Sequence, residues 1–207
     1  MGKSTIGAMM QTLRIPMHDA DACVHRLLGP NSKVRPAIAA AFPLYEYPDL
    51  YERKSKAIKR NELGALVFQD DFLRKKLESI LHPLVQKDQM EFIHANKRKG
   101  LKMVCLDIPL LFETGADKRV DYTITVSAPY FVQNQRVLSR PGMSEEKFHA
   151  ILERQMPDAE KCTLSDYVLK TGAGRAASMK ALKLILQDIH EKEYGPKEEE
   201  IMNTQIA

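Results

Sequence analysis

Four residues near the start of the chain have the types and the order of a phosphate-binding loop. Gly2-Lys3-Ser4-Thr5 matches the end of the pattern G-x-x-x-x-G-K-[ST]. In such a loop the backbone amides and the amino end of the following helix bind phosphates, the lysine adds a positive charge, and the hydroxyl holds magnesium. A chance Gly-Lys-Ser tripeptide at a solvated terminus is the alternative, and the rest of the chain must decide between the two.

The pattern begins partway through its loop. Gly2 stands at the sixth motif position, so the first glycine, three loop residues and the strand that normally precedes them are missing from the given sequence. A central strand with about four buried aliphatic side chains stabilises a domain by roughly 6–12 kcal/mol, which rivals a typical total stability of about 5–15 kcal/mol. We therefore expect the natural protein to begin upstream of Met1.

Carboxylates follow two short apolar segments. Asp19-Ala20-Asp21 comes after Ile15–His18, and Asp107 directly follows Met103–Leu106. Ligands of a parallel sheet bind at the carboxyl ends of its strands, so Asp19 and Asp21 are candidates to orient or deprotonate an acceptor hydroxyl. Asp107 is a candidate to hold a magnesium-bound water. The alternatives are a helix amino-terminal cap at Asp19 and a turn cap at Asp107.

Side chains around the first two aspartates could be mistaken for a transition-metal cluster. His18, Cys23 and His25 lie within a few residues of Asp19 and Asp21. Their spacings do not match the usual zinc patterns, and carboxylates at a phosphate site favour magnesium. We expect no zinc there.

Arginines mark a segment that could close over the phosphates. Arg136 and Arg140 lie four residues apart on one face of an expected helix, and Arg154 lies on the next helix. Pro141-Gly142 between the helices is a plausible hinge, so the segment could act as a lid whose guanidinium groups contact the phosphates. Simple solvation on an exposed helix is the alternative for each arginine.

Apolar periodicity alternates between helix-like and strand-like stretches, which is typical of an α/β fold. We expect a break at His82-Pro83, because proline lacks the amide donor and disfavours helical geometry in the preceding residue. The region 33–60, with three prolines, is less regular. Helices are expected at 4–13, 22–28, 61–81, 83–96, 129–140, 144–156 and 176–189, and strands at 15–18, 103–106, 120–126 and 167–169.

The composition limits the partners. Lys and Arg outnumber Asp and Glu by 31 to 27, and this net charge of +4 is too mild to require nucleic acid or a membrane as partner, although it suits an anionic small molecule. Three cysteines show no C-x-x-C spacing, and no apolar stretch approaches the roughly 18 residues of a spanning helix. We expect a cytoplasmic protein that is a monomer or a weak homo-oligomer.

Motifs along most of the chain together resemble the dephospho-coenzyme A kinase family. The order and spacing agree as well, and the resemblance covers residues 2–172, departing from many members at Lys170-Thr171-Gly172, where an Asn near the adenine is common. The motifs are Gly2-Lys3-Ser4-Thr5, Asp19-Ala20-Asp21, Leu81-His82-Pro83-Leu84, Asp107–Glu113, Gln135–Arg140, Gln155 and Ser165–Val168.

The resemblance implies a fold and a reaction. The fold is a three-layer phosphate-loop (P-loop) NTPase-like parallel sheet flanked by helices, here without its first strand and the start of the loop. The reaction transfers the γ-phosphate of ATP to the ribose 3′-hydroxyl of dephospho-coenzyme A, with Mg²⁺. A single kinase domain would span 1–195, with a helical acceptor-binding part at about 26–100, a lid at about 140–160 and a polar tail at 196–207.

The resemblance also assigns roles to residues. Asp21 would be the general base, assisted in catalysis by Lys3 and Arg140. The nucleotide-binding residues would be Gly2, Lys3, Ser4, Thr5 and Arg136. The acceptor-binding residues would be Asp19, Arg60, His82 and Arg154, and the magnesium ligands would be Ser4 and Asp107.

Two alternatives stay open. One is another P-loop kinase of a small metabolite or a nucleoside monophosphate, which activity against a panel of acceptors separates from the first reading. The other is a truncated, inactive nucleotide-binding module. Replacing Asp21 by Asn tests the latter, because a kinase would keep ATP binding and lose turnover, whereas a binding module would lose nothing.

Overall fold

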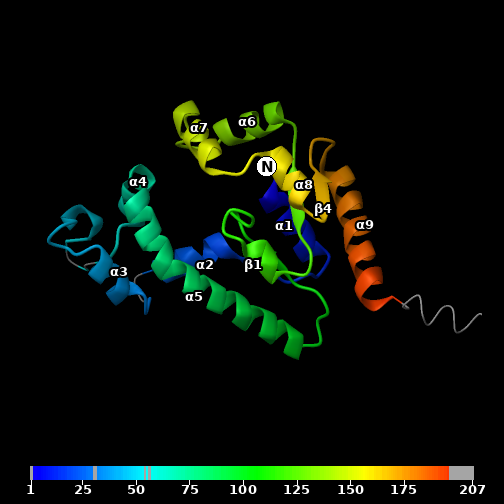
Figure 1. Cartoon of the computed structure of the whole chain (residues 1–207), viewed down its shortest axis with the longest axis horizontal. Coiled ribbons are helices and arrows are strands. Elements are labelled where there is room, and N and C mark those ends of the chain that lie inside the picture. The colour runs from blue at the N-terminus through cyan, green and yellow to red at the C-terminus, as the bar shows by residue number, and fades with distance from the viewer. Residues whose placement is uncertain (1, 30–31, 54, 56, 196–207) are drawn as a thin grey trace, which may run out of the picture. The chain divides into compact units, whose positions relative to one another are not determined.

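The computed structural model describes residues 2–29, 32–53, 55 and 57–195. Contacts divide the chain into two compact units. The first unit comprises Met1–Leu13 and Leu110–Ala207, and the second comprises Arg14–Pro109. Each unit carries its own pair of parallel strands and its own covering helices (Figure 1).

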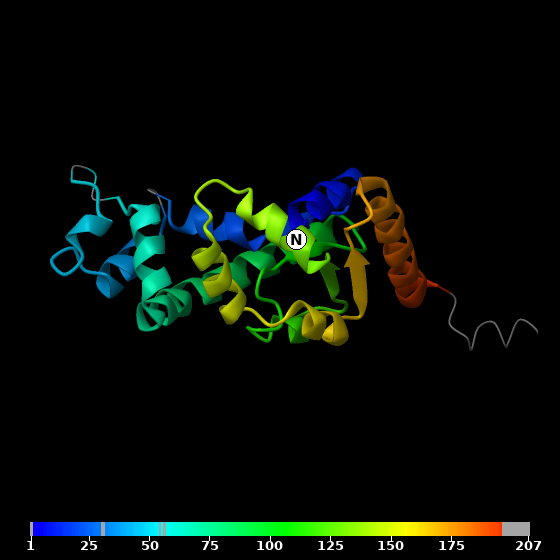
Figure 2. The ribbon, with the colours of Figure 1, turned by 90° about the horizontal axis from the view of Figure 1, so that it is seen from above.

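A parallel pair of strands organises the first unit. Strands β3 (Ile124–Ser127) and β4 (Tyr167–Lys170) pair from Ile124 opposite Tyr167 to Ser127 opposite Lys170. Helix α8 (Asp158–Leu164) packs on β3, and α9 (Arg175–Tyr194) packs on β4 and α1 (Lys3–Thr12) (Figure 2). Leu169 of β4 and Leu182 of α9 are fully buried, so apolar packing fixes this layer of helices on the strands.

Two more helices follow β3 in the first unit. They are α6 (Tyr130–Leu138) and α7 (Glu145–Arg154), which pack on each other. Ser144 begins α7, since its hydroxyl accepts a hydrogen bond from the Lys147 amide at 3.3 Å. A short 3₁₀ helix at Ala116–Arg119 precedes β3.

The second unit pairs β1 (Met17–Asp19) with β2 (Cys105–Asp107), also in parallel. The chain between these strands is helical. It forms α2 (Ala20–Leu27), α3 (Arg35–Ala41), a 3₁₀ turn at Pro48–Leu50, α4 (Arg60–Gln69) and the long α5 (Asp71–Arg98).

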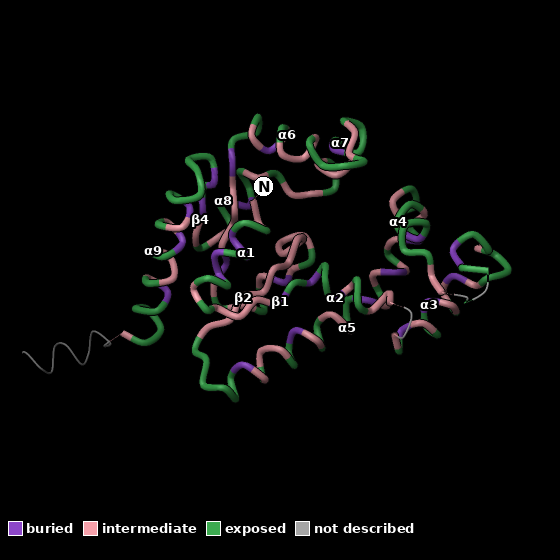
Figure 3. Tube along the Cα trace, turned by 180° about the vertical axis from the view of Figure 1, so that it is seen from behind, coloured by how far each residue is buried: buried purple, intermediate pink, exposed green. Residues whose placement is uncertain are grey.

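Helix α5 carries the core of the second unit. Helices α2, α3 and α4 all pack on it, and buried positions recur along its length on one side in Figure 3. Buried apolar residues of α3, α4, α5 and the segments next to α3 form one cluster: Val34, Ile38, Phe42, Leu50, Tyr51, Leu63, Leu73, Leu77 and Leu81.

The expected helix break at His82-Pro83 is wrong. Pro83 lies inside α5, and the break falls at Asp70, whose carboxylate accepts hydrogen bonds from the amides of Phe72 and Leu73 and so caps α5. The helix continues through Pro83 because Leu81 is buried in the apolar cluster and Leu84 packs against it. Tertiary packing outweighs the local cost of the proline.

Other elements agree with the expectations in kind and differ at their ends. The expected strand 120–126 is shorter and begins at Ile124, the region 33–60 contains α3, and α8 was not expected. The α/β class, with parallel strands flanked by helices, is confirmed. The predicted polar tail 196–207 lies outside the described residues.

None of the helices in the described part of the chain combines the length and the apolar character needed to cross a membrane.

Candidate active site

Two of the predicted carboxylates meet in the second unit. Asp19 and Asp107 are the last residues of β1 and β2 and stand opposite each other in the parallel register. Neighbouring strands lie about 4.8 Å apart and opposite residues share a face, so the two side chains leave the same end of the strand pair. Asp19 is exposed and Asp107 half-buried. This places two hard oxygen donors together, as magnesium prefers.

The third carboxylate lies at the amino end of α2. Asp19 caps that helix, because its Oδ1 accepts a hydrogen bond from the Ala22 amide at 2.9 Å. The cap considered for Asp19 from the sequence is therefore present. Asp21 is exposed in the first turn of α2, where the helix dipole favours the ionised carboxylate. An ionised, accessible Asp21 can accept a proton from a hydroxyl group.

The residues of the phosphate-binding motif begin α1 in the first unit. Gly2 has φ 96°, a left-handed conformation that favours glycine, and its carbonyl accepts hydrogen bonds from the amides of Thr5 and Ile6, both at 3.0 Å. Lys3 is half-buried, whereas Ser4 and Thr5 are exposed in the first turn. The amino end of α1 thus presents amides, an ammonium group and hydroxyls, which are the groups that bind a phosphate.

Arg136 lies beside this helix start. Its guanidinium group donates to the Oγ1 and to the carbonyl oxygen of Thr171, both at 3.1 Å. A Cβ placed on Gly2 would stand 3.4 Å from Thr171 Oγ1 and 3.6 Å from Arg136 Nη1. The structure therefore brings together Gly2, Arg136 and the end of β4, where Thr171 is in turn bonded to Ser127 of β3.

The arginines of the predicted lid lie on exposed ends of helices. Arg140 follows α6 and Arg154 ends α7, and both are exposed. Between them Gly142 has φ 76°, a left-handed turn of the kind that hinges use. The structure does not group Arg140 with Arg136, which is turned to Thr171.

A buried ion pair anchors the end of that segment. Lys161 Nζ of α8 lies 2.7 Å from Glu113 Oε1, and the same oxygen accepts the Met156 amide at 2.9 Å. Burial alone would raise the pKa of the Glu113 carboxyl, but the bonds from Lys161 and Met156 hold it below its ordinary value. Glu113 thus remains ionised and ties the turn between α7 and α8 to residues 110–115.

The acceptor-side candidates lie on the helices of the second unit. Arg60 begins α4 and donates to the His25 carbonyl of α2 at 3.4 Å. His82 lies on α5 and is exposed. Arg60 therefore contacts α2, whereas His82 lies on another helix, α5.

Three contributors were not predicted from the sequence. They are Thr171, Lys161 and Asp88 of α5, and none of the three stands in a local motif that marks its contact. Each acts through a contact between residues far apart in the chain, such as the 35 positions between Arg136 and Thr171. A single sequence carries no local signal for such pairs.

Comparison with known proteins identifies relatives along nearly the whole chain. A sequence profile of the dephospho-CoA kinase family matches residues 1–176. The dephospho-CoA kinase of Novosphingobium aromaticivorans is 44% identical over 192 residues, covering 93% of this chain and 91% of the relative. That of Rhizobium etli is 47% identical, covering 83% of this chain and 80% of the relative.

Solved structures are also similar to this chain over most of its length. The crystal structure of TT1252 from Thermus thermophilus superposes with a TM-score of 0.75 at 31% identity, covering 90% of this chain and 91% of that one. The dephospho-CoA kinase from Campylobacter jejuni superposes with a TM-score of 0.65 at 26% identity, covering 93% of each chain.

Proposed function

Because the chain belongs to the dephospho-CoA kinase family, in which ATP phosphorylates dephospho-CoA to give CoA, we propose which of its residues bind ATP and which act on the acceptor. The first unit binds ATP, and the second unit supplies the carboxylates that act on the acceptor. The hydroxyl that is phosphorylated is the ribose 3′-hydroxyl of dephospho-CoA. The mild net charge of +4 supports a small anionic substrate rather than nucleic acid.

The amino end of α1 holds the phosphates of ATP. The amides of the first turn and the Lys3 ammonium group neutralise the β- and γ-phosphates, while Gly2 keeps the backbone in the left-handed conformation that begins the helix. Thr5 adds a hydroxyl in the same turn. Arg136, fixed by Thr171 directly beside Gly2, contributes a planar cation with a set orientation.

Each unit offers oxygen donors suited to magnesium. The Ser4 hydroxyl would hold the ion, and Asp107 would hold one of its water molecules. When bound, magnesium neutralises charge on the phosphates of ATP. The pairing of Asp107 with Asp19 at the ends of β1 and β2 supports this assignment, because it leaves two carboxylate side chains at one edge.

Asp21 accepts the proton of the acceptor hydroxyl as its oxygen attacks the γ-phosphorus, the bond from that phosphorus to the bridging oxygen breaks, and ADP leaves. Asp19 fixes the start of α2 through its cap and adds negative charge that favours proton transfer to this edge. Arg60 and His82 contact the acceptor, and Arg140 with Arg154 neutralises charge on the transferring phosphoryl group. The cytoplasmic location and the monomeric or weakly oligomeric state remain predictions from the sequence.

The observation that carries this assignment is the grouping of Asp19, Asp107 and Asp21 where two parallel strands end. Asp21→Asn tests it. We expect kcat for CoA formation to fall by about 10²–10⁴-fold, because the amide cannot accept the proton, while the dissociation constant of ATP stays within twofold. Asp49→Asn, which changes an exposed acid elsewhere in the second unit, should leave kcat unchanged.

Two outcomes separate the parts of this proposal. Turnover retained by the Asp21→Asn variant would refute the role of Asp21 as the base. Phosphorylation of adenosine monophosphate in preference to dephospho-CoA, measured with the unaltered protein, would refute the choice of acceptor.

A further inference from the structure

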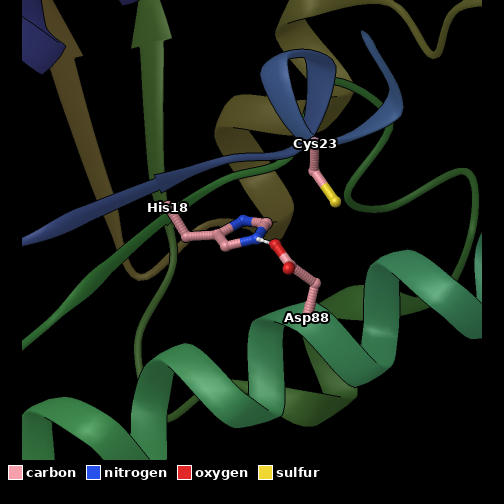
Figure 4. A group of neighbouring side chains, drawn as sticks. All are labelled: His18, Cys23 and Asp88. Atoms are coloured by element: carbon pink, nitrogen blue, oxygen red, sulfur yellow. Dashed lines mark hydrogen bonds and ion pairs between the residues drawn. The ribbon is translucent and has the colours of Figure 1, made fainter. Parts of the chain in front are cut away.

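One carboxylate of α5 lies next to three side chains of the segment that carries Asp21. Asp88 Oδ2 lies 2.8 Å from His18 Nε2 and 2.8 Å from the Arg26 guanidinium nitrogen Nη2. The Cys23 sulfur lies within 4.8 Å of an Asp88 carboxylate oxygen. Figure 4 shows His18 and Cys23 pointing from β1 and α2 toward Asp88 on the helix below.

His18 and Cys23 are the buried members of the cluster, whereas the side chains of Arg26 and Asp88 are 61% and 39% exposed. His18 is 5% exposed and Cys23 1%, and the His18 ring meets Phe92 of α5 edge-on at 5.5 Å. Burial alone would raise the pKa of the Asp88 carboxyl, but the bonds from His18 and Cys23 and the charge of Arg26 hold it below its ordinary value. Asp88 is therefore an ionised, half-exposed acceptor that contacts the buried His18.

The three donors flank the carboxylates of the candidate active site. His18 immediately precedes Asp19, and Cys23 and Arg26 follow Asp21 on α2. One carboxylate thus fixes the end of β1 and the first two turns of α2, so the short stretch between them has little freedom to move. Asp21 lies in that stretch, on the exposed side.

The same three side chains also offer nitrogen, sulfur and oxygen atoms within 4.8 Å of one another, a set that a transition metal can bind. Two observations favour hydrogen bonding instead. Asp88 Oδ2 already accepts from both His18 and Arg26, and the Arg26 cation would repel a metal ion. Burial raises the pKa of the Cys23 thiol to about 11, which disfavours the thiolate that a metal needs.

We propose that Asp88 is a positioning residue that holds Asp21 in place for phosphoryl transfer by fixing β1 and α2 at once. This inference rests on the proposed role of Asp21 as the base. Asp88 itself contacts neither substrate. It belongs to α5, so the helix that forms the core of the second unit also sets the geometry of the catalytic carboxylate.

Asp88→Ala is the direct test. We expect kcat for CoA formation to fall by about 10–100-fold, because displacement of a reacting group by about 1 Å has effects of this order. The dissociation constant of ATP should stay within twofold, since Gly2, Lys3 and Arg136 belong to the other unit. Glu78→Gln is the matched control, an acid on the same helix that also pairs with an arginine, Arg74, and it should leave kcat unchanged.

A double-mutant cycle separates positioning from general destabilisation. If Asp88 acts through Asp21, then Asp88→Ala added to Asp21→Asn lowers kcat no further than Asp21→Asn alone. A further tenfold loss in the double variant would overturn the proposal. Full turnover of Asp21→Asn would instead refute the role of the base, which is a different failure.

Two further measurements cover other outcomes. If Asp88→Ala does not fold, Asp88→Asn keeps the size and one acceptor oxygen, and we expect it to lower kcat less than tenfold and to speed hydrogen exchange in residues 17–27. Unchanged exchange and unchanged kcat in Asp88→Asn and in Arg26→Gln would refute the proposal. Stoichiometric zinc binding by the unaltered protein that Cys23→Ser abolishes would show a metal site in place of the hydrogen-bonded cluster.

Discussion

Gly2 occupies the one position of the phosphate-binding motif where the backbone itself demands glycine. Its φ of 96° costs any other residue roughly 1–2 kcal/mol, whereas an added Cβ would make only ordinary van der Waals contacts with Thr171 and Arg136, at 3.4 and 3.6 Å. We expect Gly2→Ala to weaken ATP binding by about 5–30-fold, because alanine disfavours the left-handed conformation with which Gly2 begins α1. Equilibrium titration with ATP measures this effect.

Gly64 provides the control for that substitution. It lies inside α4 with no atom within 4 Å of an added Cβ, so Gly64→Ala should stabilise the helix by roughly 0.5–1 kcal/mol and leave ATP binding unchanged. Equal ATP affinity in the Gly2→Ala variant and the unaltered protein would show that the conformation of Gly2 is not needed for nucleotide binding.

Single residues of the site were predictable where the motif is local. Gly2-Lys3-Ser4-Thr5 and Asp19-Ala20-Asp21 are continuous in sequence, and the cap at Asp19 follows from its place before a helix. Asp88 was not predictable, because it contacts His18 from 70 positions away and nothing in the neighbouring residues marks it. The assigned catalytic roles of the motif residues stay predictions until the substitutions above are measured.

At the scale of elements, Pro83 is a conflict between local preference and packing. Pro83 has no backbone amide to donate to the helix, yet α5 is continuous from Asp71 to Arg98. Pro83 is exposed, so replacing it loses little packing. We expect Pro83→Ala to raise the free energy of unfolding by about 1–3 kcal/mol, measured by denaturant titration.

Gln86→Ala is the control for Pro83→Ala, because Gln86 is an exposed position of the same helix that already has its amide. Its free energy of unfolding should change by less than about 0.5 kcal/mol. A lower stability in Pro83→Ala would mean that the proline is favourable in the folded helix and that local preference and packing do not conflict at this position.

The pair of Glu113 and Lys161 joins two elements of the first unit and predicts a pH effect. Their side chains are 16% and 10% exposed. Removing one partner leaves the other buried and unpaired, so we expect Glu113→Gln to lower the free energy of unfolding by about 3 kcal/mol near pH 7. Glu91→Gln in the exposed pair with Lys87 is the control and should cost less than about 1 kcal/mol.

The sign of the pH dependence follows from the lowered pKa of Glu113. Its ordinary value is 4.5, and the folded protein holds it below that value. The stabilisation by the pair is therefore fully present above pH 4.5 and is lost as the pH falls through the lowered folded pKa. Denaturant titrations across this range should show the difference between the unaltered protein and Glu113→Gln shrinking as the pH falls, and a constant difference would contradict the assignment.

The sequence predicted the kinds of element better than their limits. Periodicity identified the helices and the parallel strands, because a buried face repeats along each of them. It misplaced the break between α4 and α5, since proline is a strong local signal while the cap at Asp70 and the burial of Leu81 depend on the finished fold. Helix α8 is short, and it is held by β3 rather than by its own pattern.

At the scale of the whole molecule, the chain crosses between the two units twice. It leaves the first unit after Leu13 and returns at Leu110, so the second unit is an insertion between α1 and the rest of the first unit. Each unit has its own core, centred on Leu169 and Leu182 in one and on the cluster around α5 in the other. A substrate that binds to one unit should therefore slow hydrogen exchange mainly in that unit.

Hydrogen exchange with one substrate at a time tests that separation. ATP with magnesium should slow exchange in residues 2–13 and 128–139, because the proposed phosphate-binding groups are Lys3, Ser4 and Arg136. Dephospho-CoA should slow exchange in residues 17–28 and 60–69, which contain Asp21 and Arg60. Residues 185–194, at the end of α9, serve as the control and should change with neither substrate. Protection by dephospho-CoA confined to the first unit would place the acceptor with the nucleotide-binding residues and overturn the division of labour proposed for the two units.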